Sequence, residues 1–290
     1  MTLNTNALLI DARVHDLGEL TIRRVLPFAR AGTVRRHVGP FVFLDHIGPI
    51  ESERPLFVAE HPHIGLATAT YLFEGEILHK DSLGSEQVIR ERELNLMTAG
   101  KWITHIEQGL TEEVHGLQFW IALPQDEEQC EPSFHHLEGA DLPTWTLGKD
   151  VVCQLLMGEY QGKFAETQFP SRAYFMVFDS ASSKSHSLNL EIGERELALY
   201  VAEGTVTTQD HGVIVAGQLL VLDATFTGDQ DGTSEPKMYP IELGPGTRLA
   251  VFGGDPLDGP RHMKWNYVAS DEALIAQAEK KWKEQSEIPD

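Results

Sequence analysis

Two short stretches of the sequence carry residue types that commonly bind metals, His61-Pro62-His63 and His105-Ile106-Glu107. Each pair lies in a β-like segment, where residues i and i+2 point to the same face about 6.6 Å apart along the chain. Both pairs can therefore lean onto one ion, held by three imidazoles and one carboxylate. This donor set suits a divalent transition metal such as Fe(II), Mn, Ni or Zn, and an octahedral ion would keep about two positions open for small ligands.

Other polar residues could support such a site. His79 and His115 could each hydrogen-bond a metal-bound imidazole, because ligand histidines usually need an outer partner, but an ordinary strand or turn histidine explains them about as well. Asp45 and His46 precede the first pair and could reach the ion from a neighbouring strand, although a turn cap explains Asp45 equally well. The sequence alone leaves these roles open.

The segments between the motifs indicate a β-protein. Short apolar runs such as Ala67–Phe73 alternate with Gly, Pro and Asp, which predicts an all-β sandwich or barrel. A helix is expected only near the end, where Ser270 can serve as its cap. Its apolar face recurs every fourth residue, at Leu274, Ala278 and Trp282.

A weak internal repeat relates the two halves of the chain. Four residues of the first half recur in the second at one offset: Tyr71, Glu74, Gly75 and Asp81 correspond to Tyr200, Glu203, Gly204 and Asp210. Both copies run from a β-like stretch into a turn. The repeat therefore predicts a duplicated β-barrel.

The same offset indicates whether the second copy keeps the metal ligands. It places Leu190 opposite His61 and Ile192 opposite His63. An ungapped extension from a second, less secure match places Gln230 and Gly232 opposite His105 and Glu107. None of the four substitutes is a plausible ligand there. We therefore expect a single metal site, in the N-terminal half.

Length, charge and cysteine content bound the function. The 290 residues suffice for two domains, predicted as a metal-binding domain at 1–138 and a second domain at 139–290 that includes the helix. Acidic residues outnumber basic ones 44 to 23, which argues against binding to nucleic acid or to a membrane surface. We expect a cytoplasmic protein for three reasons. The sequence has two cysteines, Cys130 and Cys153, its N-terminus lacks an apolar signal core, and it contains no membrane-spanning run.

The order of motifs along nearly the whole chain resembles that of one family. The matching stretches are His61-Pro62-His63, Tyr71-Leu72-Phe73-Glu74-Gly75, His79-Lys80-Asp81-Ser82-Leu83-Gly84, Met97-Thr98-Ala99-Gly100, His105-Ile106-Glu107 and His115-Gly116-Leu117-Gln118. Together they resemble the pirins, two-domain members of the cupin superfamily. The resemblance implies a bicupin, with two jelly-roll-type β-barrels of which the second is degenerate. It also implies an iron in the first barrel, bound by His61, His63, His105 and Glu107; Fe(II) is expected, and Mn, Ni, Cu, Co or Zn suit the same donors.

Two places depart from the pirin pattern. Glu91-Arg92-Glu93 stands where the family usually has Pro-Gly-Asp, so we expect a differently built turn without a residue suited to positive φ. Lys101-Trp102 stands just before the second ligand pair, where a small residue is common, and Trp102 could narrow the pocket mouth. The second departure bears on substrate size.

The family's activities imply two alternatives for one site. In the first, the protein resembles quercetin 2,3-dioxygenases, which open a flavonol ring with O₂, and Glu107 is the general base that takes the phenolic proton. Aromatic side chains could wall a pocket for this flat substrate: Phe41, Phe43, Trp102, Phe119 and Trp120. In the second, the iron is a redox sensor in a non-catalytic regulator whose acidic surface docks a protein partner. An apolar pocket over the metal would favour the enzyme.

Overall fold

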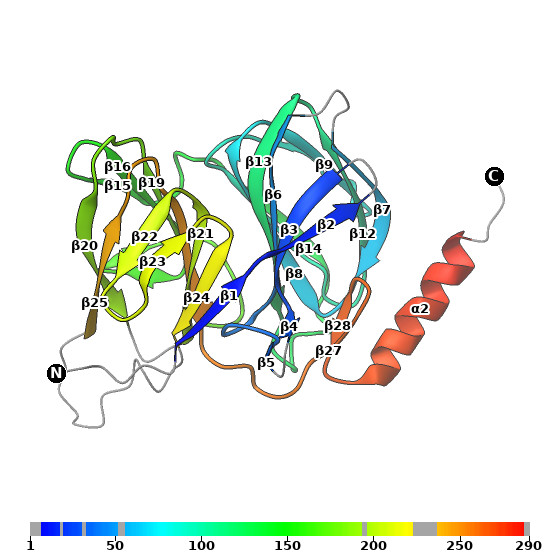
Figure 1. The fold of residues 1–290 in the computed structure, drawn as a ribbon. Coiled ribbons are helices and arrows are strands. Elements are labelled where there is room, and N and C mark those ends of the chain that lie inside the picture. Colours follow the sequence, from blue (N-terminus) through cyan, green and yellow to red (C-terminus); the bar gives the residue numbers. More distant parts are fainter. Residues whose placement is uncertain are drawn as a thin grey trace. The chain divides into compact units, whose positions relative to one another are not determined.

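A computed structural model describes residues 7–17, 20–30, 33–51, 56–192, 196–222 and 237–286. Strands dominate these residues, and a helix, α2 (Glu272–Ser286), follows the last strand (Figure 1). The prediction of an all-β chain with a C-terminal helix is therefore confirmed. Among the described residues no helix is long and apolar enough to span a membrane, and Cys130 and Cys153 are free thiols.

The chain forms two compact units. We call His15–Ile22, Phe41–Gly139 and Leu257–Asp290 the N-barrel, and Met1–Val14, Arg23–Pro40 and Ala140–Pro256 the C-barrel. One change of unit, at Gly139 and Ala140, lies beside the boundary expected from the turn-rich sequence. The units are nevertheless discontinuous, because the closing residues, including α2, belong to the N-barrel.

The N-barrel consists of two sheets. The larger has the strand order β14 (Ser133–Leu137), β11 (Leu94–Thr98), β8 (Leu66–Glu74), β13 (Glu113–Ala122), β6 (Phe41–Glu51), β3 (Leu20–Leu26) and β2 (Arg13–Leu17). The smaller has the order β10 (Glu86–Ile89), β9 (Ile77–Asp81), β12 (Ile103–Gly109) and β7 (Phe57–His63). Strand β8 is buried on both faces, which explains why its sequence is almost continuously apolar or small. An apolar cluster of Ile22, Ile47, Leu56, Leu72, Ile77, Ile89 and Val114 forms part of its core.

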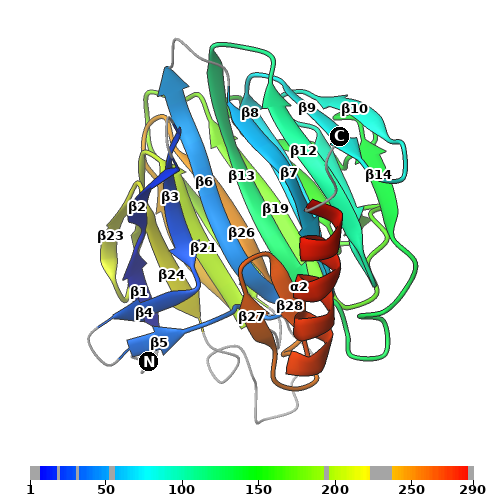
Figure 2. The ribbon, with the colours of Figure 1, turned by 90° about the vertical axis from the view of Figure 1, so that its right-hand side faces the viewer.

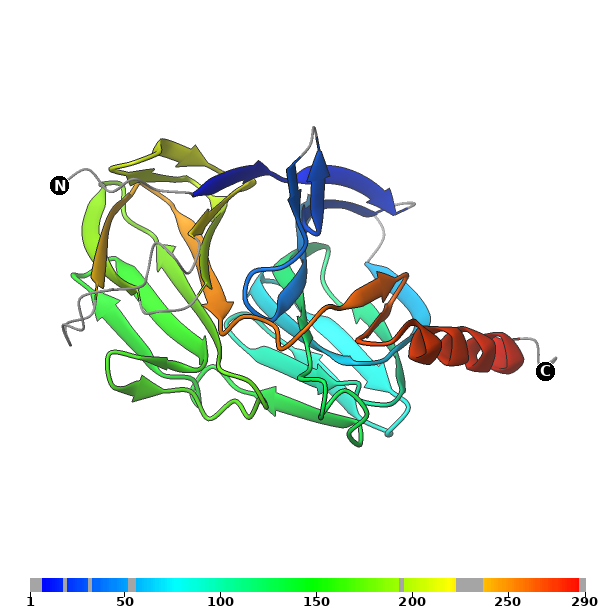
Figure 3. The ribbon, with the colours of Figure 1, turned by 90° about the horizontal axis from the view of Figure 1, so that it is seen from below.

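The C-terminal segment completes the N-barrel. A hairpin of β27 (His262–Lys264) and β28 (Tyr267–Ala269) pairs with the end of β7 through an Ile64–Tyr267 bridge. Figures 2 and 3 both show α2, in red, beside this orange hairpin. Ile275 and Ala278 bury their side chains there, packed against Tyr267. The cap of α2 is Asp271 rather than Ser270: Asp271 Oδ1 accepts the Ala273 N–H at 2.8 Å, whereas Ser270 donates to Glu128.

The C-barrel repeats this architecture. Its larger sheet has the order β1 (Leu8–Asp11), β24 (Gln218–Leu222), β21 (Glu196–Glu203), β26 (Arg248–Gly254), β19 (Ala173–Ser180), β16 (Val151–Met157) and β15 (Thr144–Leu147). Its smaller sheet has the order β20 (His186–Ile192), β25 (Lys237–Leu243), β22 (Thr205–Thr208) and β23 (Gly212–Val215). Two short hairpins accompany them, β17 (Glu159–Tyr160) with β18 (Lys163–Phe164), and β4 (Phe28–Arg30) with β5 (Thr33–Arg35). Strand for strand, the order matches that of the N-barrel, which confirms the predicted duplication.

Strand register fixes which residues of the two barrels are equivalent. His61 lies opposite His105, and Leu190, its counterpart by the sequence offset, lies opposite Tyr239. Glu107 lies opposite His79, and Ile241 lies opposite Thr208, the counterpart of His79. Tyr239 and Ile241 therefore stand in the C-barrel where His105 and Glu107 stand in the N-barrel.

The ungapped extension that selected Gln230 and Gly232 is therefore wrong, and both residues lie outside the described part of the chain. The connection between the equivalent strands β11 and β12 spans residues 99–102, whereas that between β24 and β25 spans residues 223–236. The longer connection shifts the alignment. The expectation that the second barrel lacks the metal ligands still stands. Ile241 offers no donor atom, and burial raises the pKa of Tyr239, so its phenol stays protonated.

The turn before β11 also differs from the expectation. Arg92 adopts a φ of 63°, in the left-handed region that glycine favours. Its N–H donates to the Leu72 carbonyl at 2.8 Å, and the Arg90 N–H donates to Glu93 Oε2 at 2.7 Å. The turn thus has a positive-φ residue although the sequence offers no glycine there.

Candidate metal centre

Strands β7 and β12 bring the three predicted imidazoles together. These strands are antiparallel neighbours, with His61 directly opposite His105 and His63 opposite Ile103. The ring centroids lie 4.3 Å apart for His61 and His105, and 5.1 Å apart for His63 and His105. One nitrogen from each of the three rings lies within 4.8 Å of the others. The two motifs thus meet on one face, as the i, i+2 spacing predicts.

Backbone carbonyls fix the proton on two of these rings. His61 Nδ1 lies 2.8 Å from the Ala59 carbonyl oxygen, and His63 Nδ1 lies 3.0 Å from that of Asn266. A carbonyl only accepts, so in each ring Nδ1 carries the hydrogen and donates it. The Nε2 atoms of His61 and His63 are consequently unprotonated in the neutral rings, and each offers a lone pair.

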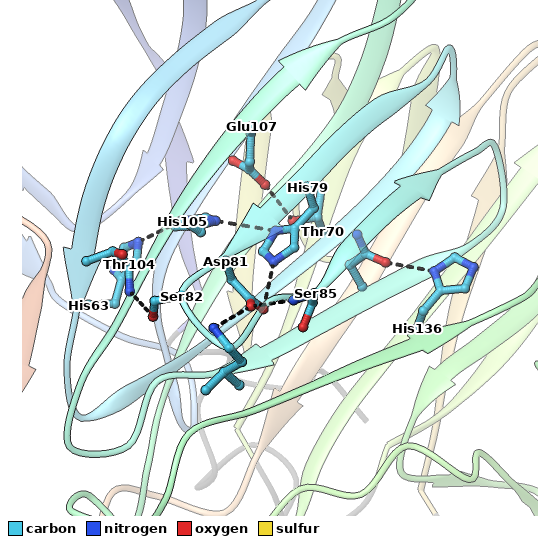
Figure 4. A network of polar contacts seen from close by, with 12 residues as sticks. His63, Thr70, His79, Asp81, Ser82, Ser85, Thr104, His105, Glu107 and His136 are labelled. Carbon is cyan, nitrogen blue, oxygen red and sulfur yellow. Dashed lines mark hydrogen bonds and ion pairs between the residues drawn. The ribbon is translucent and has the colours of Figure 1, made fainter.

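A carboxylate orients the third ring through an intervening histidine. Asp81 Oδ2 accepts from His79 Nε2 at 3.3 Å, and His79 Nδ1 lies 3.4 Å from His105 Nδ1 (Figure 4). Asp81 is itself fixed, because its Oδ1 accepts the N–H groups of Leu83 at 2.9 Å and Ser85 at 3.1 Å. With His79 neutral, His105 Nδ1 donates to it, which leaves His105 Nε2 unprotonated. This is the outer-partner arrangement typical of metal-ligating histidines.

The unprotonated Nε2 atoms of the three rings together form a site suited to a cation. His63 Nε2 and His105 Nε2 lie 3.2 Å apart (Figure 4). With the tautomers that the neighbours impose, these two nitrogens would face each other as acceptors, which is repulsive unless a proton or a metal ion lies close to both. Three bare imidazole nitrogens are donors that divalent transition metals prefer. The residues present therefore fit a metal ion.

Burial favours the neutral, metal-binding form of the rings. His63 and His105 expose 1% and 2% of their surface. Desolvation, reinforced by the neighbouring imidazole of His61, holds the pKa of His63 well below 6.5. The pKa of His105 is likewise well below 6.5, first through desolvation and then through the rings of His61, His63 and His79. At neutral pH both rings are thus ready to donate a lone pair.

Glu107 stands beside this cluster, on the side of His79. Its carboxylate forms a second candidate group with His79 and His105, whose donor atoms lie within 4.8 Å of one another. A register shift between His105 and Glu107 alters the regular strand pairing there. Gln118 Nε2 donates to Glu107 Oε2 at 2.8 Å, and Thr70 Oγ1 lies 3.5 Å from Glu107 Oε1. The carboxylate is thus oriented by neutral donors from β8 and β13.

The other residues singled out in the sequence occupy separate places. His115 pairs with His46, with their Nε2 atoms 2.7 Å apart, and its ring packs on Phe73. Asp45 is buried on β6, opposite Gln118. Of the two predicted helper histidines, His79 contacts a proposed ligand directly, and His115 forms a buried pair of its own.

The five aromatic residues proposed as pocket walls lie in different parts of the N-barrel. Phe43 stacks on Trp120 with centroids 4.0 Å apart, and Trp120 meets His63 edge-on at 5.2 Å. Phe119 directly precedes Trp120 in the same strand, so it points to the opposite face, where it packs edge-on with Phe41. Trp102 packs with Tyr267 of the closing hairpin and lies under Lys281 of α2, with Nζ 4.2 Å from the ring. Of these five, Trp120 contacts the site histidine His63, and Phe43 packs on Trp120.

Three residues with clear contacts in the site were not singled out in the sequence: Asp81, Gln118 and Thr70. One signal was available for Asp81. His79 and Asp81 have the same i, i+2 spacing as the two ligand pairs, and the strand register places them opposite Glu107 and His105. Gln118 and Thr70 lie on strands of the other sheet, so only the closed barrel brings them to Glu107.

Comparison with known proteins adds the following matches. The sequence profile described as Pirin matches residues 20–121, and the one described as Pirin C-terminal cupin domain matches residues 177–287. A pirin-like protein of Caulobacter vibrioides is 38% identical over 290 residues, which cover 95% of this chain and 92% of that protein. A Pseudomonas aeruginosa protein named "Putative quercetin 2,3-dioxygenase PA1205" is 37% identical over 285 residues, covering 95% and 83%.

A solved structure also resembles the fold of this chain. The crystal structure of a quercetin 2,3-dioxygenase from Acinetobacter baumannii matches this fold with a TM-score of 0.83 and 29% sequence identity. The match covers 96% of this chain and 89% of the other. The likeness therefore extends through both barrels.

Proposed function

The chain belongs to the pirin family, and on that premise we propose that it is a metal-dependent dioxygenase of the quercetinase type. The proposed ion is Fe(II), and the proposed ligands are His61, His63, His105 and Glu107. The substrate would be a small flavonol-like molecule whose ring is opened by O₂. The observation that carries this proposal is the convergence of three imidazoles whose Nε2 atoms are kept unprotonated by fixed neighbours.

Names of relatives support the reaction class. The Pseudomonas aeruginosa relative at 37% identity and the Acinetobacter baumannii structure at 29% identity both carry the name quercetin 2,3-dioxygenase, the former as a putative assignment. Fold likeness alone would not carry an activity, because barrels of this kind host many reactions. Cytoplasmic location, expected from the two cysteines, the N-terminus without an apolar signal core and the lack of a membrane-spanning run, forms part of the same proposal.

Each residue has a distinct task in this proposal. A bound divalent ion would supply Lewis acidity and one-electron chemistry at its open positions. Glu107 would take the phenolic proton of the substrate at one of its carboxylate oxygens. Gln118 and Thr70 would orient that carboxylate through the hydrogen bonds already described. His79 and Asp81 would hold the His105 ring in place.

The aromatic pair beside the histidines suits a flat substrate. Trp120 lies 5.2 Å from His63, centroid to centroid, and presents its other flank to Phe43. An aromatic ring entering from this side would meet an edge or a face of Trp120, as aromatic pairs prefer. Trp102 contacts the closing hairpin and the helix α2, so this proposal does not require Trp102 to contact the substrate.

Anaerobic reconstitution tests the proposal. The metal-free protein is loaded with Fe(II), mixed with quercetin, and O₂ uptake is followed for the wild type, for Glu107→Ala and for Glu112→Ala, which alters an exposed carboxylate of the β12–β13 turn. We expect uptake well above that of free Fe(II) for the wild type and for Glu112→Ala, and a loss of at least about 100-fold for Glu107→Ala, the usual contribution of a general base.

Two outcomes would contradict the proposal in different ways. If the wild type binds one equivalent of iron but takes up no O₂ above free iron, the dioxygenase assignment fails and the non-catalytic redox-sensing regulator takes its place. If His61→Ala binds metal as tightly as the wild type, the ligand assignment itself fails. Metal content is therefore measured alongside uptake for every variant.

A further inference from the structure

A cavity of about 430 Å³ lies in the C-barrel. Three strands of the larger sheet reach it: Arg172 immediately precedes β19, Glu196 begins β21, and Asp255 follows β26. The β17–β18 hairpin adds Tyr160. Small-molecule sites usually have volumes of about 300–1,000 Å³, so the cavity is large enough for one small organic ligand.

The equivalent place in the N-barrel is filled by an indole. There, a row of directly paired residues crosses three strands: Phe43, Trp120 and Thr68. The row at the same register in the C-barrel is Tyr174, Gly253 and Leu197. Tyr174 and Leu197 both line the cavity. Gly253 thus stands where Trp120 stacks on Phe43, and no side chain takes the place of that indole.

The backbone keeps this position free of any side chain. A Cβ atom built on Gly253 would lie 1.9 Å from the carbonyl oxygen of Glu196, far below a permitted contact. The residue that corresponds to Trp120 therefore has no side chain, because the strands pack too closely at Gly253 to admit one.

The walls of the cavity combine aromatic rings with an excess of negative charge. Tyr160 and Tyr174 are each more than nine-tenths buried, with ring centroids 6.1 Å apart. The ionisable lining side chains are four carboxylates and one guanidinium, from Glu159, Glu191, Glu196, Asp255 and Arg172. Tyrosine faces and carboxylates both attract cations.

One of these carboxylates is already committed to other partners. Glu196 Oε1 lies 2.9 Å from an Arg35 guanidinium nitrogen, and its Oε2 accepts the Gly39 N–H at 2.7 Å. Asp255 also takes part in an interaction of its own, so the lining charges to consider for a ligand are the carboxylates of Glu159 and Glu191 and the guanidinium of Arg172. A cationic ligand would therefore be favoured over a neutral or anionic one of the same shape.

From the missing indole and the charge of the walls, we propose that the C-barrel cavity binds a small planar aromatic ligand that carries an ammonium group. Its ring lies against Tyr174, much as Trp120 lies against Phe43 in the N-barrel, and its ammonium group is stabilised by Glu191. This site is independent of the proposed dioxygenase activity. It assigns a ligand-binding role to the barrel that lacks the histidines.

Calorimetric titration of the full chain with tryptamine tests this inference. Indole serves as the neutral probe and indole-3-acetate as the anionic one, since both keep the ring. We expect one tryptamine per chain, bound several-fold tighter than indole, with indole-3-acetate weaker than both. Equal affinity for the three probes, or no tryptamine binding up to its solubility, would overturn the proposal.

Variants locate the bound probe. Leu197→Trp should fill the cavity and abolish binding, and Tyr174→Leu should weaken tryptamine up to about tenfold, because an aromatic pair contributes about 0.5–1.5 kcal/mol beyond its buried area. Glu191→Gln should weaken tryptamine several-fold without changing indole affinity. Glu166→Gln, which alters an exposed carboxylate elsewhere in the C-barrel, is the matched control and should leave binding unchanged.

Two further measurements test whether the probe binds in the C-barrel cavity. Thermal unfolding of each variant shows whether it is folded, and Glu191→Gln, which alters a partly exposed side chain, carries the test if Leu197→Trp fails to fold. Tryptamine affinity that is unchanged in both variants would refute the site. Binding that is lost in His63→Ile would instead place the probe in the N-barrel and would also refute it.

Discussion

The two barrels share a strand order and differ in what they bury at four equivalent positions. The N-barrel has His61, His63, His105 and Glu107, whereas the C-barrel has Leu190, Ile192, Tyr239 and Ile241. The C-barrel residues expose at most 3% of their surface and form part of an apolar cluster. The fold therefore needs neither a histidine nor a carboxylate at these places. Buried imidazoles that face one another are a local cost to stability, which a bound cation would offset.

Replacing a proposed ligand by its C-barrel counterpart should have the largest effect. We expect His63→Ile to weaken metal binding at least about 60-fold. Structural metal sites bind with about 10 kcal/mol or more, which divided among four ligands is about 2.5 kcal/mol each, and every 1.4 kcal/mol is a factor of ten. Competition with a chelator of known affinity measures the change.

The matched variant lies in the other barrel. Leu190→Ala removes a fully buried side chain, so it should lower the free energy of unfolding by about 2–5 kcal/mol and leave metal affinity unchanged. Metal affinity that falls equally in both variants would show that the loss reflects general destabilisation rather than a lost ligand.

The next effect concerns the carboxylate behind His105. Asp81→Asn removes the negative charge that His79 Nε2 faces at 3.3 Å. We expect metal affinity to fall about 10- to 100-fold, as is usual when the outer partner of a ligand histidine is altered. Asp210 occupies the same place in the repeat, so Asp210→Asn is the control. If Asp81→Asn binds metal like the wild type, the chain from Asp81 to His105 has no part in the site.

A smaller effect is expected at the proposed base. Gln118→Leu removes the 2.8 Å hydrogen bond to Glu107, which should lower O₂ uptake about tenfold, equivalent to a hydrogen bond of about 1–1.5 kcal/mol. Metal affinity should change less than about threefold, because Gln118 orients Glu107 by a hydrogen bond and does not itself bind the ion. Gln108→Leu changes an exposed glutamine of β12 and should alter neither property. A parallel loss of metal and uptake in Gln118→Leu would contradict a purely positioning role.

The smallest effect is the pH dependence of stability that two N-barrel histidines contribute. His63 and His105 have pKa values well below 6.5 in the folded chain, whereas the unfolded chain takes up protons on both rings at about pH 6.5. The unfolded state therefore binds more protons below that pH, and the metal-free protein loses stability as pH falls. The slope is at most about 1.4 kcal/mol per pH unit for each ring.

Chemical denaturation of the metal-free chain at several pH values measures this slope. His63→Ile should reduce it, because isoleucine does not titrate, and Leu190→Ala should leave it unchanged. An unaltered slope in His63→Ile would assign the pH dependence to other groups.

Local patterns predicted the ligand pairs well, because same-face spacing in a strand is a property of the backbone. The offset of the repeat likewise identified Leu190 and Ile192 correctly as counterparts of His61 and His63, since β7 and β8 keep their separation in β20 and β21. The second, less secure match failed for His105 and Glu107, because the connection before β25 is longer than that before β12. Loop length leaves no periodic signal in the sequence.

The other contacts of the site could not be predicted from the sequence, because they depend on how strands distant in sequence pair. His79 and Asp81 belong to β9, whose register with β12 decides that they face Glu107 and His105. Gln118 reaches Glu107 from a different sheet, across the closed barrel. The cap of α2 was misplaced by one residue for a similar reason, because Ser270 is drawn to Glu128, far away in sequence. Such contacts follow from the folded topology rather than from neighbouring residues.

One ligand of the proposed metal centre depends on a residue that is synthesised much later, because the Asn266 carbonyl accepts a hydrogen bond from His63. It holds the Nδ1 hydrogen of His63 from 203 residues away along the chain. A nascent chain that has left the ribosome only as far as Glu107 already contains every proposed ligand but lacks the partner that fixes one of them. The finished geometry therefore arises only after Asn266 has been synthesised, so a segment late in this sequence secures a ligand encoded much earlier.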